Sequence, residues 1–307
     1  MLTVVSYLRG IPPGNKNPEK PASLTNFISG INACGDRGIL SNEISLQKAD
    51  VAIIQGYVHE EGKSAPHLTF RKQILDYQKK HNGRTIIVDS NLFLYRDPNN
   101  SKGYLRYSYD GIFPNTGEYC YSAPDPLRWN KIKRNLNIDL KPWRRTGNHI
   151  LICLQRNGGW SMKGLDVVDF FNNIVQHIRL HTDRPIIVRT HPGDKKSINY
   201  VKNLTGNNVK ISKGLSLIND LENAWATVVY NSSPAVASII EGVPAFVVDP
   251  TYSQAAEVSN HDISRIENPE LPERLHWVQK MAQCHWTQSE LASGEAWRHM
   301  RNWAQRQ

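Results

Sequence analysis

The stretch LICLQRNGGWSMKG, residues 151–164, lies almost at the midpoint of the 307-residue chain and sets the fold that the sequence predicts. Its apolar start predicts a buried strand, which ends at Gln155 in a polar turn with two glycines. Apolar residues then recur at helical spacing over residues 165–181, which predicts an amphipathic helix. A strand, a polar glycine turn and a helix in this order form the repeating unit of a parallel α/β sheet.

The same unit repeats after this stretch. Further strands are expected at 185–188, 209–211, 226–230 and 245–248, and a helical pattern follows each of the first three. Together these segments predict a doubly wound sheet. Such sheets bind ligands at the carboxyl ends of their strands.

The first half of the chain shows the same alternation in a less regular form. Strands are expected at 3–8, 50–54 and 85–88 with helices between them, whereas residues 90–145 show no clear periodicity. The expected fold class is therefore α/β, with two doubly wound, Rossmann-like domains that face a cleft. The expected division is into a first domain, a second domain and C-terminal helices that pack back on the first domain, with bounds 1–147, 148–283 and 284–307.

The composition is that of an ordinary globular protein, with 39% hydrophobic and 21% charged residues. No apolar run approaches the ~20 residues that a membrane span needs, and the N-terminus lacks the features of a signal peptide. Four cysteines are widely scattered, without metal-ligand spacing. We therefore expect free thiols, a cytoplasmic location and no membrane partner. The expected assembly is a monomer or a small homo-oligomer.

Positive charge is concentrated in the first half of the chain. Residues 1–148 hold 21 Lys and Arg against 13 Asp and Glu, whereas the remainder holds 16 against 15. Within the first half, the segment 128–145 carries seven cations, one acidic residue and two tryptophans. A basic segment with interleaved aromatic residues is typical of a surface that meets a polyanion, although it can also be a solvated face.

Unusual polar residues in the second half follow the predicted strands. Glycines at such positions let a backbone approach a ligand closely, and amide groups at a helix N-terminus favour an anion. Each turn taken alone also fits an ordinary turn or helix cap. Because several fall at one edge of one sheet, we expect them to bind a diphosphate. The candidate residues are Arg156, Asn157, Gly158, Gly159, Trp160, His191, Pro192, Gly193, Lys213, Asn231, Ser232 and Ser233.

The motifs QRNGGWSMKG, RTHPGD and YNSSPAVASIIEGVPAFV resemble the nucleotide-binding domain of GT-B glycosyltransferases, in particular capsule-type enzymes and phage proteins. The resemblance covers roughly residues 148–250. It implies a GT-B fold and a nucleotide-sugar co-substrate, expected to be a UDP-sugar. It also implies that the histidine turn and the serine-capped helix hold the diphosphate, and that Glu241 contacts the ribose. The EX7E motif of retaining enzymes is absent, because Ser233 stands eight positions before Glu241, which favours an inverting transfer.

In this family the N-terminal domain binds the acceptor, and here that half carries the excess positive charge. The resemblance to phage DNA glycosyltransferases therefore suggests a hydroxymethylcytosine-type DNA acceptor. The alternatives are a cell-surface or capsule polysaccharide, a lipid-linked acceptor, a non-catalytic DNA-binding protein of GT-B shape, and a sugar-nucleotide epimerase. The expected DNA-binding residues are Arg128, Trp129, Lys131, Lys133, Arg134, Arg144 and Arg145.

An inverting transfer needs a base that removes the proton of the acceptor hydroxyl. Asp89 ends the third predicted strand of the first half and is the first candidate, and Asp36 and Asp110 are the alternates. No DxD metal motif is evident, so we expect no metal site and no tightly bound cofactor. Protein cations and helix amides would then stabilise the diphosphate, with Mg²⁺ as an alternative.

Overall fold

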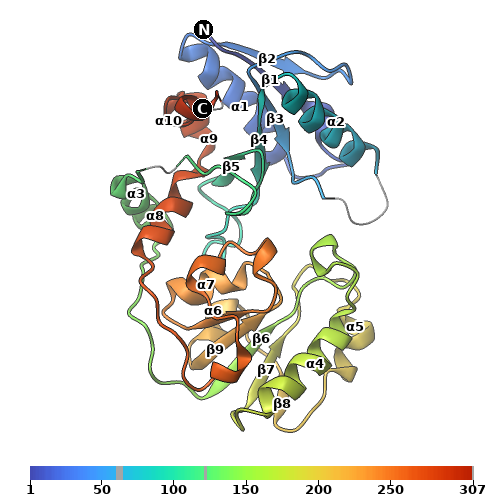
Figure 1. Cartoon of the computed structure of the whole chain (residues 1–307), viewed down its shortest axis with the longest axis vertical. Coiled ribbons are helices and arrows are strands. Elements are labelled where there is room, and N and C mark those ends of the chain that lie inside the picture. The colour runs from blue at the N-terminus through green and yellow to red at the C-terminus, as the bar shows by residue number, and fades with distance from the viewer. Residues whose placement is uncertain (60–64, 121–122, 306–307) are drawn as a thin grey trace. The chain divides into compact units, whose positions relative to one another are not determined.

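The computed structural model describes residues 1–59, 65–120 and 123–305. The chain divides into two compact units, which Figure 1 shows together and which are described separately. Unit 1 comprises Met1–Asn91, Asn99–Asn135 and Val278–Gln307, and unit 2 comprises Leu92–Pro98 and Leu136–Trp277.

The change from unit 1 to unit 2 comes at residue 135 rather than at the expected residue 147. The reason lies in the backbone of the intervening segment. The Lys141 N–H donates to the carbonyl of Ile240 (2.9 Å), and the Arg144 N–H donates to that of Gly242 (2.7 Å). The basic segment 128–145 is therefore divided between the two units.

Unit 1 contains a six-stranded sheet in the order β11-β5-β4-β3-β1-β2. Four strands are parallel, β5 runs antiparallel to β4, and β11 runs antiparallel to β5. The strands are β1 Thr3–Tyr7, β2 Arg37–Ser41, β3 Val51–Gln55, β4 Arg84–Asp89, β5 Leu105–Tyr109 and β11 His285–Trp286. The helices are α1 Glu19–Ala33, α2 Pro66–Lys80, α3 Pro126–Leu136, α9 Gln288–Ala292 and α10 Glu295–Met300, and α8 Leu275–Gln283 begins in unit 2 and ends in unit 1.

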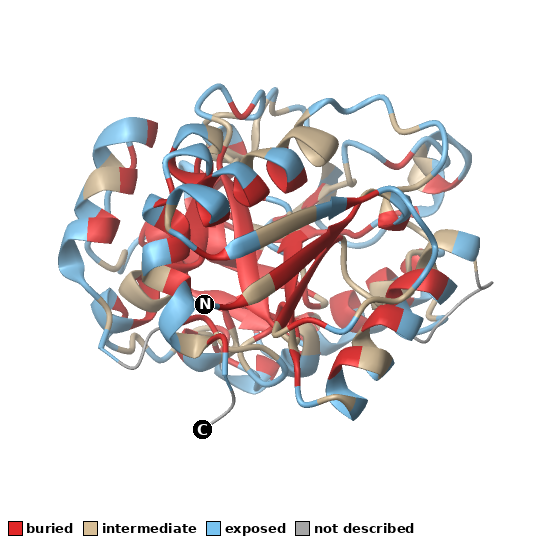
Figure 2. Cartoon of the chain, turned by 90° about the horizontal axis from the view of Figure 1, so that it is seen from above, coloured by how far each residue is buried: buried red, intermediate tan, exposed pale blue. Residues whose placement is uncertain are grey.

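The C-terminal helices form part of the core of unit 1. Trp297 of α10 is fully buried and meets Phe27 of α1 edge to face, with ring centroids 6.1 Å apart. Leu291 of α9 joins the same apolar cluster, which also includes Val4 and Val88 of the sheet. In Figure 2, the strands are buried along most of their length, whereas the helices alternate buried and exposed positions. This alternation is the pattern of amphipathic helices that cover a sheet.

Unit 2 contains a five-stranded, wholly parallel sheet in the order β10-β9-β6-β7-β8. The strands are β6 His149–Cys153, β7 Ile186–Arg189, β8 Val209–Ile211, β9 Ala224–Val229 and β10 Ala245–Val247. The helices are α4 Val167–Arg179, α5 Ser197–Tyr200, α6 Leu217–Leu221 and α7 Pro234–Ile240. From β6 the chain winds outward through β7 and β8, then crosses to β9 on the other side. The order of the strands therefore reverses between β6 and β9, where doubly wound sheets bind ligands.

Candidate functional site

The switch point of unit 2 is held together by Gln155, the second residue after β6. Its side-chain oxygen accepts a hydrogen bond from the Asn231 N–H (3.0 Å), and its side-chain amide donates to the hydroxyl of Ser161 (2.7 Å). Gln155 and Asn231 are 6% and 3% exposed. Because both polar groups of Gln155 are used in this way, the turns after β6 and β9 are fixed to one another.

Asn231 is a structural residue of this edge rather than an exposed ligand. Its amide donates to the carbonyl of Ser161 (3.0 Å) and to the carboxylate of Asp249 (3.2 Å). Asp249 also forms an ion pair with Lys163 (3.0 Å). Burial opposes the ionisation of Asp249, but the hydrogen bonds from Lys163, Asn231 and Thr251 outweigh it and hold its pKa below the ordinary value.

The glycine turn after β6 owes its shape to Asn157 and Gly158. The Asn157 N–H donates to Asp194 (3.0 Å), and its side-chain amide donates to Asp166 (2.9 Å), the N-cap of α4. Gly158 has φ +71°, in the left-handed region that favours glycine. The Gly159 N–H closes the turn on the carbonyl of Arg156 (3.0 Å). Asn157 therefore supports the turn, and the side chain of Arg156 is left exposed.

Arg156 and His191 meet at the carboxyl edge of the sheet, beside Gly193. A Cβ atom on Gly193 would lie 2.8 Å from Nη2 of Arg156 and 3.2 Å from Cε1 of His191, so both side chains lie against this glycine. Nδ1 of His191 accepts a hydrogen bond from the Gly193 N–H (2.9 Å). In the neutral ring the proton therefore lies on Nε2, which is a donor. Burial, and then the charge of Arg156, lower the pKa of His191, so the ring is neutral at pH 7.

Two serines precede α7 at the same edge. The hydroxyl oxygen of Ser232 is a buried atom without a hydrogen-bond partner in the described part of the chain. Ser233 is exposed and does not cap α7 with its side chain, and Pro234 is the first residue of that helix. The two hydroxyls thus stay outside the hydrogen bonding of the helix start.

Three further predicted residues occupy the rim of this edge. Trp160 meets Tyr252 edge to face (5.9 Å), and Nζ of Lys163 lies 4.6 Å from the centre of the Tyr252 ring. Pro192 is exposed between His191 and Gly193, and Lys213 is exposed after β8. The Trp160–Tyr252 pair gives this part of unit 2 an aromatic surface.

Glu241, which the family resemblance assigns to the ribose, lies at the far end of α7. It follows α7, whose C-terminal end lies at the amino edge of the sheet, opposite the polar turns. The side chain is 3% exposed, accepts two hydrogen bonds from Nη2 of Arg96 (2.7 and 2.8 Å), and forms an ion pair with Lys141. Its carboxylate is therefore paired inside unit 2, and the ribose contact stays a prediction.

Asp89 ends β4 at the carboxyl edge of the unit 1 sheet, with its side chain 24% exposed. One oxygen accepts from the Ser90 N–H (2.6 Å), and the other lies 3.6 Å from Nη2 of Arg106. Arg71 of α2 is also close enough to interact electrostatically. Burial lowers the pKa of Arg71 to about 10, an effect that the charge of Asp89 opposes.

The two arginines beside Asp89 are almost wholly buried, at 3% for Arg106 and 5% for Arg71. Nε of Arg71 donates to the carbonyl of Gly10 (2.7 Å), whereas Nε and Nη1 of Arg106 have no hydrogen-bond partner in the described residues. The Asp89 carboxylate therefore lies beside the Arg106 guanidinium and within electrostatic range of Arg71. A buried, unsatisfied charged donor is a feature of functional sites as well as of water and ion sites.

The sequence prediction missed both arginines, although each had a signal. Arg106 alternates on β5 with Leu105 and Tyr107, which places it inside a buried strand. Arg71 shares a helical face with Ile74 and Gln78, which are both buried. A charged residue at a core position of a strand or a helix is the pattern that identifies such groups.

Asp36 and Asp110, the alternates to Asp89, lie at the opposite edge of the same sheet. Asp36 precedes β2 and accepts from Arg301 (2.6 Å) and from Nε1 of Trp297 (2.9 Å). Asp110 ends the antiparallel β5 and pairs with Arg84 (2.9 Å) at the start of β4. The hydrogen bond from Arg301, although opposed by burial, holds the pKa of Asp36 well below its usual range. Both carboxylates serve the structure of unit 1.

The structure also corrects the predicted DNA-binding segment. Arg128 is 6% and Trp129 is 3% exposed, because both belong to the inner face of α3. Lys131 pairs with Glu290 (2.6 Å) and Glu295 (3.0 Å). Arg144, in unit 2, donates to the carbonyls of Leu221 and Glu222 (2.5 and 2.7 Å) at the end of α6. The remaining predicted residues are exposed or half-buried: Lys133, Arg134 and Arg145.

The described residues hold no group of three or more His, Cys, Asp or Glu side chains placed to bind a metal ion. The four cysteines are unpaired. Within residues 1–59, 65–120 and 123–305, no helix combines the length and the apolar character that crossing a bilayer requires.

No model of a known protein family matches the chain, and no curated protein matches it. Two solved structures of KpsC from Thermosulfurimonas dismutans share its fold. The β-Kdo 2,4 transferase is 12% identical with a TM-score of 0.54, over 92% of this chain and 89% of that one. The β-Kdo 2,7 transferase is 13% identical with a TM-score of 0.54, over 96% and 98%. The expected fold class is confirmed: the chain is α/β, with two Rossmann-like units of the GT-B type.

Proposed function

We propose that the chain is a glycosyltransferase that takes a sugar from a nucleotide-sugar donor. The observation that carries this proposal is the pairing of Arg156 with His191 beside the switch point of unit 2, next to the serines that precede α7. A guanidinium group, an imidazole N–H and two hydroxyls at the carboxyl edge of a doubly wound sheet suit a phosphate group. The sugar transferases that share the fold support the same activity.

In this proposal the phosphate of the donor is bound by Arg156 and by the Nε2–H of His191, with Ser232 and Ser233 as further donors. Charge-assisted hydrogen bonds of this kind stabilise the negative charge that grows on the leaving phosphate as the bond to the sugar breaks. The Trp160–Tyr252 pair offers a ring face to the base or the sugar. The donor is expected to be a UDP-sugar, as the sequence motifs suggest.

Asp89 is the proposed base. Its side chain is 24% exposed at the carboxyl edge of the sheet, and a carboxylate oxygen can accept a proton. The acceptor oxygen attacks the anomeric carbon, the bond from that carbon to the phosphate oxygen breaks, and the hydroxyl proton moves to Asp89. A single displacement of this kind inverts the configuration at the anomeric carbon.

The acceptor is proposed to be a hydroxyl of a carbohydrate, such as a cell-surface polysaccharide. Modified DNA stays a second candidate, because nearly all the excess positive charge lies in unit 1. This unit holds 21 Lys and Arg against 13 Asp and Glu, whereas unit 2 holds 16 against 15. The DNA candidate is weakened because Arg128, Trp129 and Arg144 are used inside the protein.

The test is turnover with a panel of UDP-, GDP-, dTDP- and CMP-sugars, each offered with a mixture of oligosaccharides and with hydroxymethylcytosine DNA. Mass spectrometry of the products follows both the released nucleotide and the transferred sugar. The proposal expects one donor class to be consumed and one acceptor to gain the mass of a sugar. Absence of transfer from every donor to every acceptor contradicts it.

A further inference from the structure

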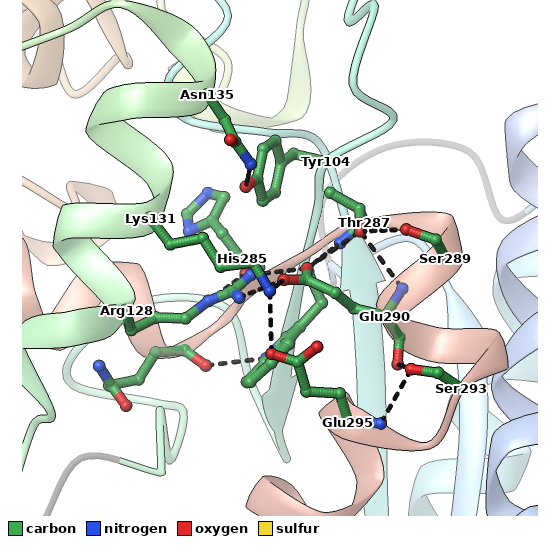
Figure 3. Close-up of polar contacts among 12 residues, drawn as sticks. Tyr104, Arg128, Lys131, Asn135, His285, Thr287, Ser289, Glu290, Ser293 and Glu295 are labelled. Carbon is green, nitrogen blue, oxygen red and sulfur yellow. Dashed lines mark hydrogen bonds and ion pairs between the residues drawn. The ribbon is translucent and has the colours of Figure 1, made fainter.

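A polar pocket in unit 1 contains none of the residues proposed above to bind the donor or to act as the base. Its volume is about 480 Å³, within the range of ligand sites in proteins. It opens between α3 and α9, and Figure 3 shows most of its side chains. The residues that line it are Lys102, Lys131, Asn135, Thr287, Ser289, Glu290, Ser293 and Glu295.

Glu290 forms a rigid wall of this pocket. It is 5% exposed and accepts from Arg128 through Nη1 (2.5 Å) and Nη2 (2.9 Å). The Arg128 guanidinium in turn lies 3.9 Å from the centre of the Trp286 ring. The Thr287 N–H donates to Glu290 (2.8 Å), and the Thr287 side chain caps α9 (Figure 3). Because each group has several partners, the shape of this wall is fixed before any ligand arrives.

The charges of the pocket nearly cancel. Nζ of Lys131 bridges the carboxylates of Glu290 (2.6 Å) and Glu295 (3.0 Å), as Figure 3 shows. Lys102 brings the lining to two cations and two carboxylates. With its charges balanced, the lining offers no net attraction to a phosphate or to a strand of nucleic acid. The pocket therefore does not suit a polyanion.

What remains on the lining is a set of uncharged hydrogen-bonding groups. Three hydroxyls come from Thr287, Ser289 and Ser293, and an amide comes from Asn135, which also donates to the Tyr104 hydroxyl (2.8 Å). The Thr287 and Ser293 hydroxyls donate to Glu290, and the Ser289 hydroxyl lies 3.1 Å from that of Thr287, so these oxygens meet a ligand mainly as acceptors. Hydroxyls can donate and accept, and so can bind a ligand that carries many hydroxyls of its own. A sugar ring has this character.

The position of the pocket connects it with Asp89. Thr287 directly follows β11, whose Trp286 pairs with Leu105 at the start of β5. The next residue of β5, Arg106, pairs with Asp89 at the end of β4. The pocket and the proposed base therefore lie at the same edge of the same sheet, one strand apart.

We propose that this pocket binds an uncharged sugar residue of the acceptor. That the bound sugar belongs to the acceptor rests on the proposed function, whereas sugar binding itself does not. Its occupant is a neutral oligosaccharide, whose hydroxyls bond to Asn135, Ser289 and Ser293.

The experiment measures binding to the full chain by saturation-transfer NMR. The probes are the neutral trisaccharides maltotriose, cellotriose and chitotriose, a heparin-derived tetrasaccharide, and a single-stranded DNA 12-mer. Ser289→Trp fills the pocket from an exposed position of α9, and Ala292→Trp places the same ring at an exposed position of α9 outside the lining. Lys102→Ala removes one polar group without filling the space.

The expected result is binding of at least one neutral trisaccharide. Ser289→Trp weakens it at least tenfold, Lys102→Ala weakens it a few-fold, and Ala292→Trp changes it less than twofold. Circular dichroism and the melting temperature establish that the variants are folded. Binding of the charged probes alone, or equal binding by Ser289→Trp and the wild type, overturns the inference. Neutral sugar binding without any binding of a nucleotide sugar would contradict the proposed function and leave the pocket as a carbohydrate site.

Discussion

At the scale of single residues, Asp89 has an environment that differs from that of the other two aspartates considered as bases. Asp36 and Asp110 are each held by an ion pair and by backbone hydrogen bonds at the amino edge of the sheet. Asp89 lies at the carboxyl edge, with an exposure close to that of Asp110 (24% and 26%), and sits 3.6 Å from Arg106, two of whose nitrogens have no hydrogen-bond partner among the described residues. This arrangement leaves the Asp89 carboxylate accessible to a substrate proton.

Replacement of Asp89 by Asn is predicted to lower the rate of transfer by a factor of about 10²–10⁴, because the amide cannot accept the proton of the acceptor hydroxyl. The affinity for the nucleotide sugar, measured by calorimetry, should change less than twofold. Asp76→Asn, on the exposed face of α2, is the matched control and should keep full activity. Full activity in the Asp89→Asn variant would remove Asp89 from the mechanism.

His191 offers a second test at this scale. Burial and the charge of Arg156 both lower its pKa, so the ring should titrate below the ordinary value of about 6.5. In Arg156→Ala, one of these causes is removed and the pKa of His191 should rise. NMR titration of the ring protons in both proteins measures the change. An unchanged pKa would show that the charge of Arg156 does not act on the His191 ring.

At the scale of elements, the strands of unit 2 and their polar turns could be predicted from the sequence because each strand is a short apolar run with a polar stop. The antiparallel β5 and the two-residue β11 were not predicted. β5 alternates aromatic and polar residues within a Tyr-rich stretch, and β11 exists only because it pairs with β5. Pairing between segments about 180 residues apart leaves no local signal in a sequence.

The same reasoning explains why the burial of Arg128 and Trp129 in the basic segment was not predicted. A count of cations along the chain contains no information on which face of α3 each residue occupies, or on where the partner acids lie. Glu290, which neutralises Arg128, stands 162 positions later. The closeness of Arg71 and Arg106 to Asp89 was missed for the same reason, because these residues come near one another only in the folded protein.

The contact of α3 with α9 predicts a pH dependence of stability. Burial opposes ionisation of Glu290, but Arg128 and Lys131 lower its pKa to about 2, from an ordinary value near 4.5. A group whose pKa is lower in the folded state stabilises the fold above its unfolded pKa. The contribution, of the order of 3 kcal/mol, is lost as the pH falls from about 4.5 toward 2.

Chemical denaturation between pH 7 and pH 2.5 measures this contribution. Glu290→Gln should lower the free energy of unfolding at pH 7 by several kcal/mol, because Arg128 is left buried without its counter-charge, and should flatten the decline below pH 4.5. Glu295→Gln, an exposed neighbour, should cost less than about 1 kcal/mol. Equal acid sensitivity of the wild type and Glu290→Gln would contradict the ion-pair account.

At the scale of the whole molecule, the excess charge belongs to unit 1 rather than to the basic segment alone. The two candidate acceptors predict different behaviour for the double charge reversal Lys133→Glu/Arg134→Glu on α3. A carbohydrate acceptor predicts unchanged transfer at 50 and 200 mM salt. A DNA acceptor predicts a large loss of affinity and a shallower salt dependence, measured with hydroxymethylcytosine DNA. Loss of transfer to an oligosaccharide in this variant would contradict the present account.

The central claim is that the Arg156–His191 pair holds the phosphate of a nucleotide sugar. Calorimetric titration of the full chain with UDP-, GDP-, dTDP- and CMP-sugars tests it most directly. Arg156→Ala is compared with Lys195→Ala, which removes an exposed cation from the His191 turn. We predict that the wild type binds one donor class and that Arg156→Ala weakens this binding about 10- to 100-fold through the loss of a charge-assisted hydrogen bond, whereas Lys195→Ala changes it less than twofold. Failure of the wild type to bind any nucleotide sugar, or equal affinity in Arg156→Ala, would contradict the claim.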